Sequence, residues 1–144
     1  MPSIQEVIER GVAAFNAHDA KSLEADLADD CTVSAPGGMT YRGRAQCMEF
    51  QRVWWDGFPD AKANPTKIHY AGSVAVEEGV FEGTHTGTLK SPMGDVPPTG
   101  RKVRGEYVSV FDVRDGKVVA QRLTFDRLLL LEQLGLVPAQ TATR

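Results

Sequence analysis

The chain has 144 residues and a mass of 15.7 kDa, a length that suits one globular domain with its own hydrophobic core. Sixteen Lys and Arg against nineteen Asp and Glu leave a net charge of −3, so the broad positive field of nucleic-acid-binding proteins is missing. The longest unbroken aliphatic run, Leu128–Leu131, is far shorter than the roughly 20 apolar residues of a membrane-spanning helix. The N-terminus also lacks a basic start before an apolar run. These features predict a cytoplasmic protein with no nucleic-acid or membrane partner.

The sequence contains no familiar cofactor or metal motif. Phosphate-binding and dinucleotide-binding glycine loops, the HExxH helix and the GxSxG elbow are all missing. His18, His69 and His85 are not spaced as a set of metal ligands. Cys31 and Cys47 are too few and too far apart for a CxxC motif, so we expect free, buried thiols. We therefore expect neither a cofactor nor a metal.

Helical patterns occupy the first two-fifths of the chain. Ser3 and Glu6 form a capping box in front of apolar residues at helical spacing: Ile4, Val7, Ile8, Val12 and Phe15. A second, shorter helix is predicted from Asp19, carrying Leu23 and Leu27 and ending at residues 29–30, and a third over residues 44–55.

Strand patterns dominate the rest of the chain. After a short β-like segment at residues 31–34, runs rich in β-branched residues alternate with Gly and Pro turns. The predicted strands cover residues 63–70, 73–89, 102–113 and 117–125, the last two joined by a hairpin turn at residues 114–116. Helices followed by a meander predict an α+β domain, with the helices packed on one face of a curved antiparallel sheet. The domain is expected to span residues 1–138, leaving residues 139–144 as a flexible tail.

Several short blocks occur in a characteristic order. They are FPDA at 58–61, GTHTG at 83–87, PPTGR at 97–101, DGKV at 115–118, FD at 125–126 and QLG at 133–135. In this order and spacing the chain resembles the SnoaL-like polyketide cyclase (ester cyclase) family, a branch of the NTF2-like superfamily. The resemblance implies a cone-shaped α+β barrel with a pocket between the sheet and the N-terminal helices. It also implies a homodimer.

The activity implied by the resemblance is a cofactor-independent intramolecular aldol condensation. In that family the base is an aspartate on the last strand, assisted by a histidine on the strand before it. Matching the blocks at 105–106 and 115–117 places these positions at Leu123 and Ser109. A leucine cannot accept a proton, and an unassisted serine is a poor base. The usual cyclase pair is therefore missing from this sequence.

Two other residues are candidates for catalysis. His85 lies in the GTHTG block near a strand end, where an imidazole could act as a base or donor at neutral pH; the alternative is a structural histidine. Asp126 stands where family members carry a matching acid. It could orient His85, lie at the pocket mouth or cap the helix that begins at Arg127.

Strand alternation predicts the residues of the pocket wall, because side chains two apart share one face of a sheet. If Ser109 and Leu123 face inward, their neighbours two residues away do so too, and the aromatic residues that end the third helix would cover the entrance. The predicted substrate-binding residues are Trp54, Phe58, Tyr107, Ser109, Phe111, Gln121, Leu123 and Phe125. This mostly apolar wall suits a flat, hydrophobic small-molecule ligand.

The sequence thus favours a small proton-transfer enzyme, of the aldol cyclase, isomerase or lyase type, acting on a hydrophobic carbonyl compound or polyketide-like ester. Two alternatives stay open. One is a non-catalytic member of the superfamily that binds small molecules, and the other is a dimeric accessory protein whose pocket has no role.

Overall fold

The computed structural model describes residues 1–139. The helices are α1 (Ile4–Ala17), α2 (Ala20–Ala25), α3 (Arg44–Gly57) and α4 (Arg127–Gln133). The strands are β1 (Leu27–Ala35), β2 (Met39–Arg42), β3 (Lys62–Ala71), β4 (Val74–Thr84), β5 (Leu89–Ser91), β6 (Gly94–Val96), β7 (Lys102–Arg114) and β8 (Lys117–Phe125). The expected order of N-terminal helices followed by strands is confirmed.

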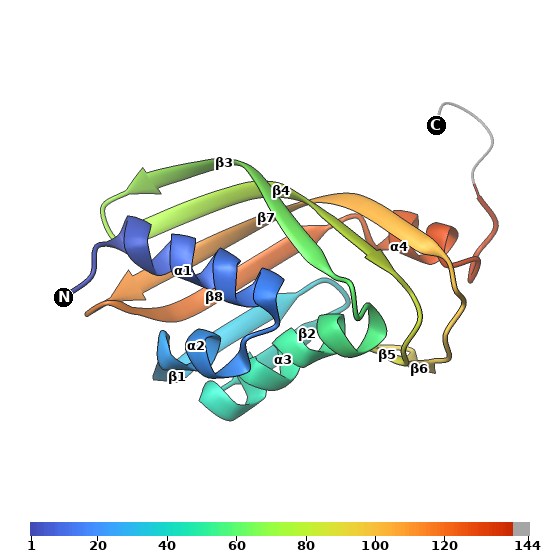
Figure 1. The fold of residues 1–144 in the computed structure, drawn as a ribbon, viewed down its shortest axis with the longest axis horizontal. Helices are drawn as coiled ribbons and strands as arrows, with labels where there is room; N and C mark the ends of the chain where they lie inside the picture. Colours follow the sequence, from blue (N-terminus) through green and yellow to red (C-terminus); the bar gives the residue numbers. More distant parts are fainter. Residues whose placement is uncertain (140–144) are drawn as a thin grey trace.

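The main sheet has the strand order β2-β1-β8-β7-β4-β3 and is curved, with α1, α2 and α3 along one face (Figure 1). Its ladders are antiparallel except for β1 and β8, which pair in parallel, a departure from the expected antiparallel sheet. Register shifts in β3 and β7 mark irregular pairing of the kind that bends a strand. Pro65 is tolerated because β3 is an edge strand. The observed architecture is the predicted α+β class.

Side-chain caps set the start of the first two helices. The Glu6 amide donates to Ser3 Oγ at 3.1 Å, which confirms the cap predicted for α1. The Ser22 amide donates to the Asp19 carboxylate at 3.1 Å, as expected for α2. The predicted extension of this helix to residues 29–30 is wrong, because Leu27 already begins β1. A helix of this length is only marginally stable by itself. From Leu27 onward, pairing with β8 in the parallel ladder stabilises the chain more than further helix would.

The second long strand also ends earlier than predicted. β4 stops at Thr84, whose amide donates to the Asp60 carboxylate at 2.6 Å. The backbone of His85 then pairs with residues 100 and 101. Leu89 belongs instead to the small β5–β6 hairpin, which lies beside the end of α3 (Figure 1). The turn at Asp115-Gly116 has positive φ at both residues, 53° and 73°, as the sequence predicts for a tight hairpin.

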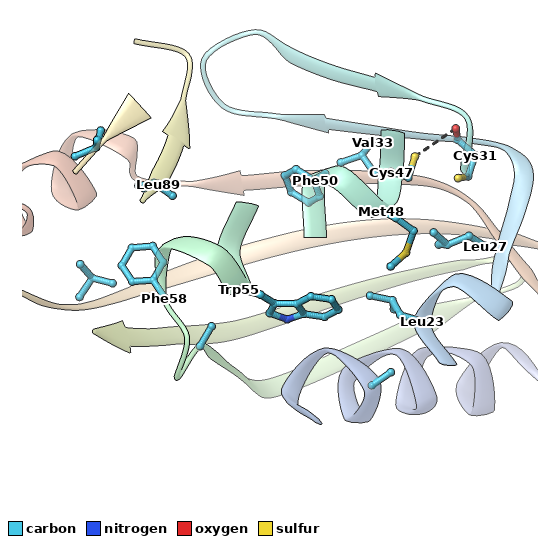
Figure 2. Packing of buried hydrophobic residues seen from close by; sticks show 14 of the residues in the cluster. Leu23, Leu27, Cys31, Val33, Cys47, Met48, Phe50, Trp55, Phe58 and Leu89 are labelled. Atoms are coloured by element: carbon cyan, nitrogen blue, oxygen red, sulfur yellow. Dashed lines mark hydrogen bonds between the residues drawn. The ribbon is translucent and has the colours of Figure 1, made fainter. Parts of the chain in front are cut away.

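The core lies between α3 and the sheet (Figure 2). Cys47 Sγ donates to the carbonyl of Cys31 at 3.4 Å, and burial raises the pKa of Cys47 to about 12. Both cysteines are free and buried, which confirms the prediction from their spacing. No helix within residues 1–139 combines the length and apolar character needed to cross a bilayer. Of the tail predicted at 139–144, residues 140–144 lie outside the described part of the chain.

Candidate ligand cavity

A cavity of about 160 Å³ lies between the concave face of the sheet and helices α1, α3 and α4. Most of its wall is apolar and comes from α1, α3, β7, β8 and α4. Strand alternation carries a few polar side chains into this wall. The buried or partly buried ones are Glu77 on β4, Tyr107 and Ser109 on β7, and Gln121 on β8, and the exposed Glu106 of β7 also contributes.

Glu77 is a carboxyl group that is 5% exposed and lies on the cavity wall. Tyr107 Oη donates a hydrogen bond to Glu77 Oε2 at 2.5 Å. Burial raises the pKa of Glu77, and the hydrogen bond from Tyr107 opposes this change only in part. Burial and the neighbouring carboxylate also raise the pKa of Tyr107, so its phenol stays neutral and keeps donating at neutral pH.

The contact between Tyr107 and Glu77 depends on Gly79. A methyl group at residue 79 would lie 2.5 Å from Tyr107 Oη, which is too close for any side chain. Glycine therefore lets the phenol lie against β4 and reach the carboxyl group two residues earlier. The contact therefore depends on three residues, Glu77 and Gly79 on β4 and Tyr107 on β7.

A second polar pair lies beside the first. Glu77 and Ser109 are partners in the β4–β7 ladder, so their side chains share one face of the sheet at neighbouring positions. Gln121 Nε2 donates to Ser109 Oγ at 3.1 Å. The Ser109 hydroxyl is thereby oriented next to the carboxyl group of Glu77.

The cavity wall contains most of the predicted substrate-binding residues: Trp54, Tyr107, Ser109, Phe111, Gln121, Leu123 and Phe125. Phe58 is not among them. It ends α3, is fully buried and packs against Trp54, Phe81 and His85.

The two predicted catalytic residues are not brought together. His85 is fully buried and does not line the cavity. Its Nδ1 lies 3.2 Å from the Thr99 amide and 2.9 Å from the Thr99 hydroxyl, and none of its hydrogen bonds in the described chain goes to Asp126. Its Nε2 has no hydrogen-bond partner there, and burial lowers its pKa. His85 therefore holds the loop at Thr99. A part for it in a reaction stays a prediction.

Asp126 does line the cavity, and its carboxylate caps α4 by accepting from the Leu129 amide at 2.9 Å. Capping is one of the three roles that the sequence predicts for Asp126. Glu77 is not among the residues that the sequence predicts. Strand alternation could have indicated it, because Ala75, Glu77 and Gly79 are alternate residues of β4 and so lie on one face of the strand. That face is buried, and it includes the carboxyl group of Glu77.

Within residues 1–139, no three His, Cys, Asp or Glu side chains form a group that could hold a metal ion. The cavity wall likewise contains no Lys, Arg or His among the described residues. Its chemistry is that of a mostly apolar chamber with one deeply buried carboxyl group and neighbouring hydroxyl and amide groups. Three less buried carboxylates, Asp26, Glu106 and Asp126, also contribute to the wall.

Solved structures share this architecture. The putative SnoaL-like polyketide cyclase of Jannaschia sp. CCS1 superposes with a TM-score of 0.83 at 21% identity, over 94% of this chain and 93% of that one. IdmH, a putative polyketide cyclase of Streptomyces antibioticus, is 29% identical with a TM-score of 0.76, over 93% and 99%. An LEH-like epoxide hydrolase of Mycobacterium tuberculosis shares the fold at 18% identity, with a TM-score of 0.70 over 91% and 88%.

No match was found among curated protein sequences. The model of the SnoaL-like polyketide cyclase family, in contrast, matches residues 5–134, which include every helix and strand described above except the first residue of α1. With its NTF2-like arrangement of helices on a curved sheet, the chain belongs to the SnoaL-like polyketide cyclase family.

Proposed function

We propose that this protein is a cofactor-independent proton-transfer enzyme for a hydrophobic carbonyl compound, with Glu77 as its acid–base residue. The observation that carries the proposal is the buried Glu77 carboxyl group on an otherwise mostly apolar cavity wall. Abstraction of a proton next to a carbonyl needs a base beside the carbon acid and a donor for the enolate oxygen. Burial moves the pKa of Glu77 upward, toward the range in which a carboxylate is an effective base.

The chemistry assigns a role to each polar group. Tyr107 holds Glu77 Oε2, which leaves Oε1 to take the proton from the substrate carbon. The electron pair of the broken C–H bond becomes the enolate, and the Ser109 hydroxyl, oriented by Gln121, donates to the enolate oxygen. In an aldol closure the enolate carbon bonds to a second carbonyl carbon of the same molecule. The Glu77 carboxylic acid then returns its proton to the new alkoxide.

This scheme replaces the expected His85–Asp126 pair and the usual cyclase pair. His85 lies behind the wall, and Leu123 occupies the wall at the position where the resemblance implies an aspartate. Glu77 puts a carboxyl group on a different strand of the same cavity. The proposed base therefore lies on β4 instead of β8, and the proton-transfer chemistry is the same.

Deuterium exchange at the α-carbon of aromatic ketones and 1,3-diketones tests this function without knowledge of the natural substrate. Glu77→Gln keeps the size of the side chain and is expected to lower the exchange rate by about 10²- to 10⁴-fold. Glu78→Gln is the matched control, because Glu78 is adjacent, half exposed and bonded to His69. Equal rates in Glu77→Gln and wild type would exclude Glu77 as the base.

A second candidate is a non-catalytic ligand-binding protein. It is favoured by Ser109 and Leu123, which stand where the resemblance implies the catalytic histidine and aspartate. Ligand-induced increases in melting temperature without any α-proton exchange would support this candidate over the enzyme.

A further inference from the structure

A second, smaller cavity of about 60 Å³ adjoins the first. It lies among α3, α4, the β1–β2 turn and the β5–β6 hairpin. Phe50, Trp54, Phe125 and Leu130 line both cavities. The two spaces are therefore adjacent and share part of their lining.

Trp54 is the largest of these shared side chains. Its ring lies 5.5 Å from that of Phe125 and 6.1 Å from that of Phe50, measured between ring centroids. The neighbouring Trp55 is buried and anchored, because its indole donates to the carbonyl of Phe15 at 3.1 Å. Trp54 is only partly buried and makes no hydrogen bond through its side chain within residues 1–139. Its ring also packs against Phe58 and Phe81, so a shift of the ring would disturb aromatic contacts but break no hydrogen bond.

The two cavities differ in charge. The first has acidic residues and no cation on its described wall, whereas Lys90 and Arg127 contribute to the second. Arg127 is the first residue of α4, where the helix dipole disfavours a positive charge. It lies against the β1–β2 turn, since a methyl group at Gly37 would be 3.5 Å from its guanidinium carbon. No carboxylate of the described chain lies within 4.0 Å of its guanidinium. Arg127 is thus a partly buried cation with no carboxylate partner among residues 1–139.

We propose that the second cavity is a subsite for the far, carboxylate-bearing end of an elongated hydrophobic substrate. The reacting carbonyl occupies the first cavity, the middle of the molecule passes beside Trp54, and Arg127 pairs with the carboxylate. A volume of about 160 Å³ is small against the roughly 300–1,000 Å³ of typical ligand sites, and the second cavity adds about 60 Å³ next to it. This inference rests on the proposed function and names its substrate class.

Titration calorimetry can test the subsite independently of turnover. The probes are 2-naphthyl ketones that carry an alkyl chain of increasing length, ending either in a carboxylate or in its methyl ester. Arg127→Gln is expected to weaken binding of the long carboxylates about tenfold and to leave the esters unchanged. Arg52→Gln is the control, because Arg52 is an exposed arginine of α3 that lines neither cavity. It should change neither series.

A second variant tests the space itself. Ala35 lines only the second cavity, so Ala35→Leu should fill it, abolish the gain in affinity with chain length and preserve binding of the short ketones. Equal affinity of wild type and Arg127→Gln for the long carboxylates would overturn the proposal. So would binding of the short ketones alone, which leaves the proposed function intact. Failure of every probe to bind would count against both.

Discussion

Glu77 occupies a position that favours its neutral form. Its folded-state pKa lies above the ordinary value of 4.5, so the folded protein binds this proton more tightly than the unfolded chain does. The stability that the group contributes is therefore complete below about pH 4.5 and declines as the pH rises through the folded pKa. The same burial that suits Glu77 for proton transfer costs stability at neutral pH.

Glu77→Gln should remove this penalty while keeping an acceptor for Tyr107. We expect the variant to gain stability relative to wild type as the pH increases from about 4 to about 8. Urea unfolding across this range measures the difference. Glu78→Gln should show no such trend, and a constant difference between Glu77→Gln and wild type would contradict the assignment.

The contacts of His85 connect separate parts of the chain. It joins the end of β4 to the loop at Thr99 and packs against Phe58 at 5.4 Å between ring centroids. Because burial lowers its pKa below 6.5, protons bind the unfolded chain more readily, and stability is lost as the pH falls below that value.

His85→Ala is expected to destabilise the protein by about 2–4 kcal/mol and to remove that loss at acidic pH. It should change the rate of α-proton exchange by no more than a few-fold. His69→Ala is the control, because His69 is exposed and its ion pair is with Glu78. A large loss of exchange with normal stability would return His85 to the catalytic candidates.

At the scale of the elements, the side chain of Gln133 ties α4 to β7 beside the cavity. Gln133 accepts from the Arg104 amide at 3.0 Å and donates to the Arg104 carbonyl at 2.8 Å. The β7–β8 ladder reaches only as far as Tyr107 and Phe125, so the Gln133 amide continues the pairing where β8 has ended. The short helix is thereby fastened across the end of the sheet.

Gln133→Ala removes both bonds and should cost about 1–2 kcal/mol. Hydrogen exchange of residues 127–133 should accelerate more than that of α1. Gln5→Ala, which removes only an exposed bond to Glu9, is the control. Unchanged protection of α4 in Gln133→Ala would show that apolar packing alone holds the helix.

Helix and strand types followed from local patterns in most of the chain. Capping residues and periodicity predicted α1, α3, β7 and β8 closely, because their signals lie within a few residues. The end of α2 and the end of β4 were missed. Each depends on distant partners, a parallel ladder to β8 for one and the carboxylate of Asp60 for the other.

At the scale of the whole molecule, one fold holds two adjoining spaces with different chemistry. The larger has a buried carboxyl group and no cation on its described wall, and the smaller has Arg127. An elongated substrate with a neutral reacting end and an acidic far end matches both. The homodimer implied by the family resemblance stays a prediction.

Composition, block order and strand alternation were enough to predict the α+β class, the family and part of the cavity wall, because each depends on local spacing. Only the tertiary structure decided the chemistry of the site. Glu77 and Gly79 belong to β4 and Tyr107 to β7, and the phenol reaches the carboxyl group only because the register of the two strands sets it over a glycine. The opposite holds for His85, which the GTHTG block marks as a candidate. In the fold it is fully buried and does not line the cavity. Which side chains face a common space depends on long-range pairing, and one sequence does not display that pairing.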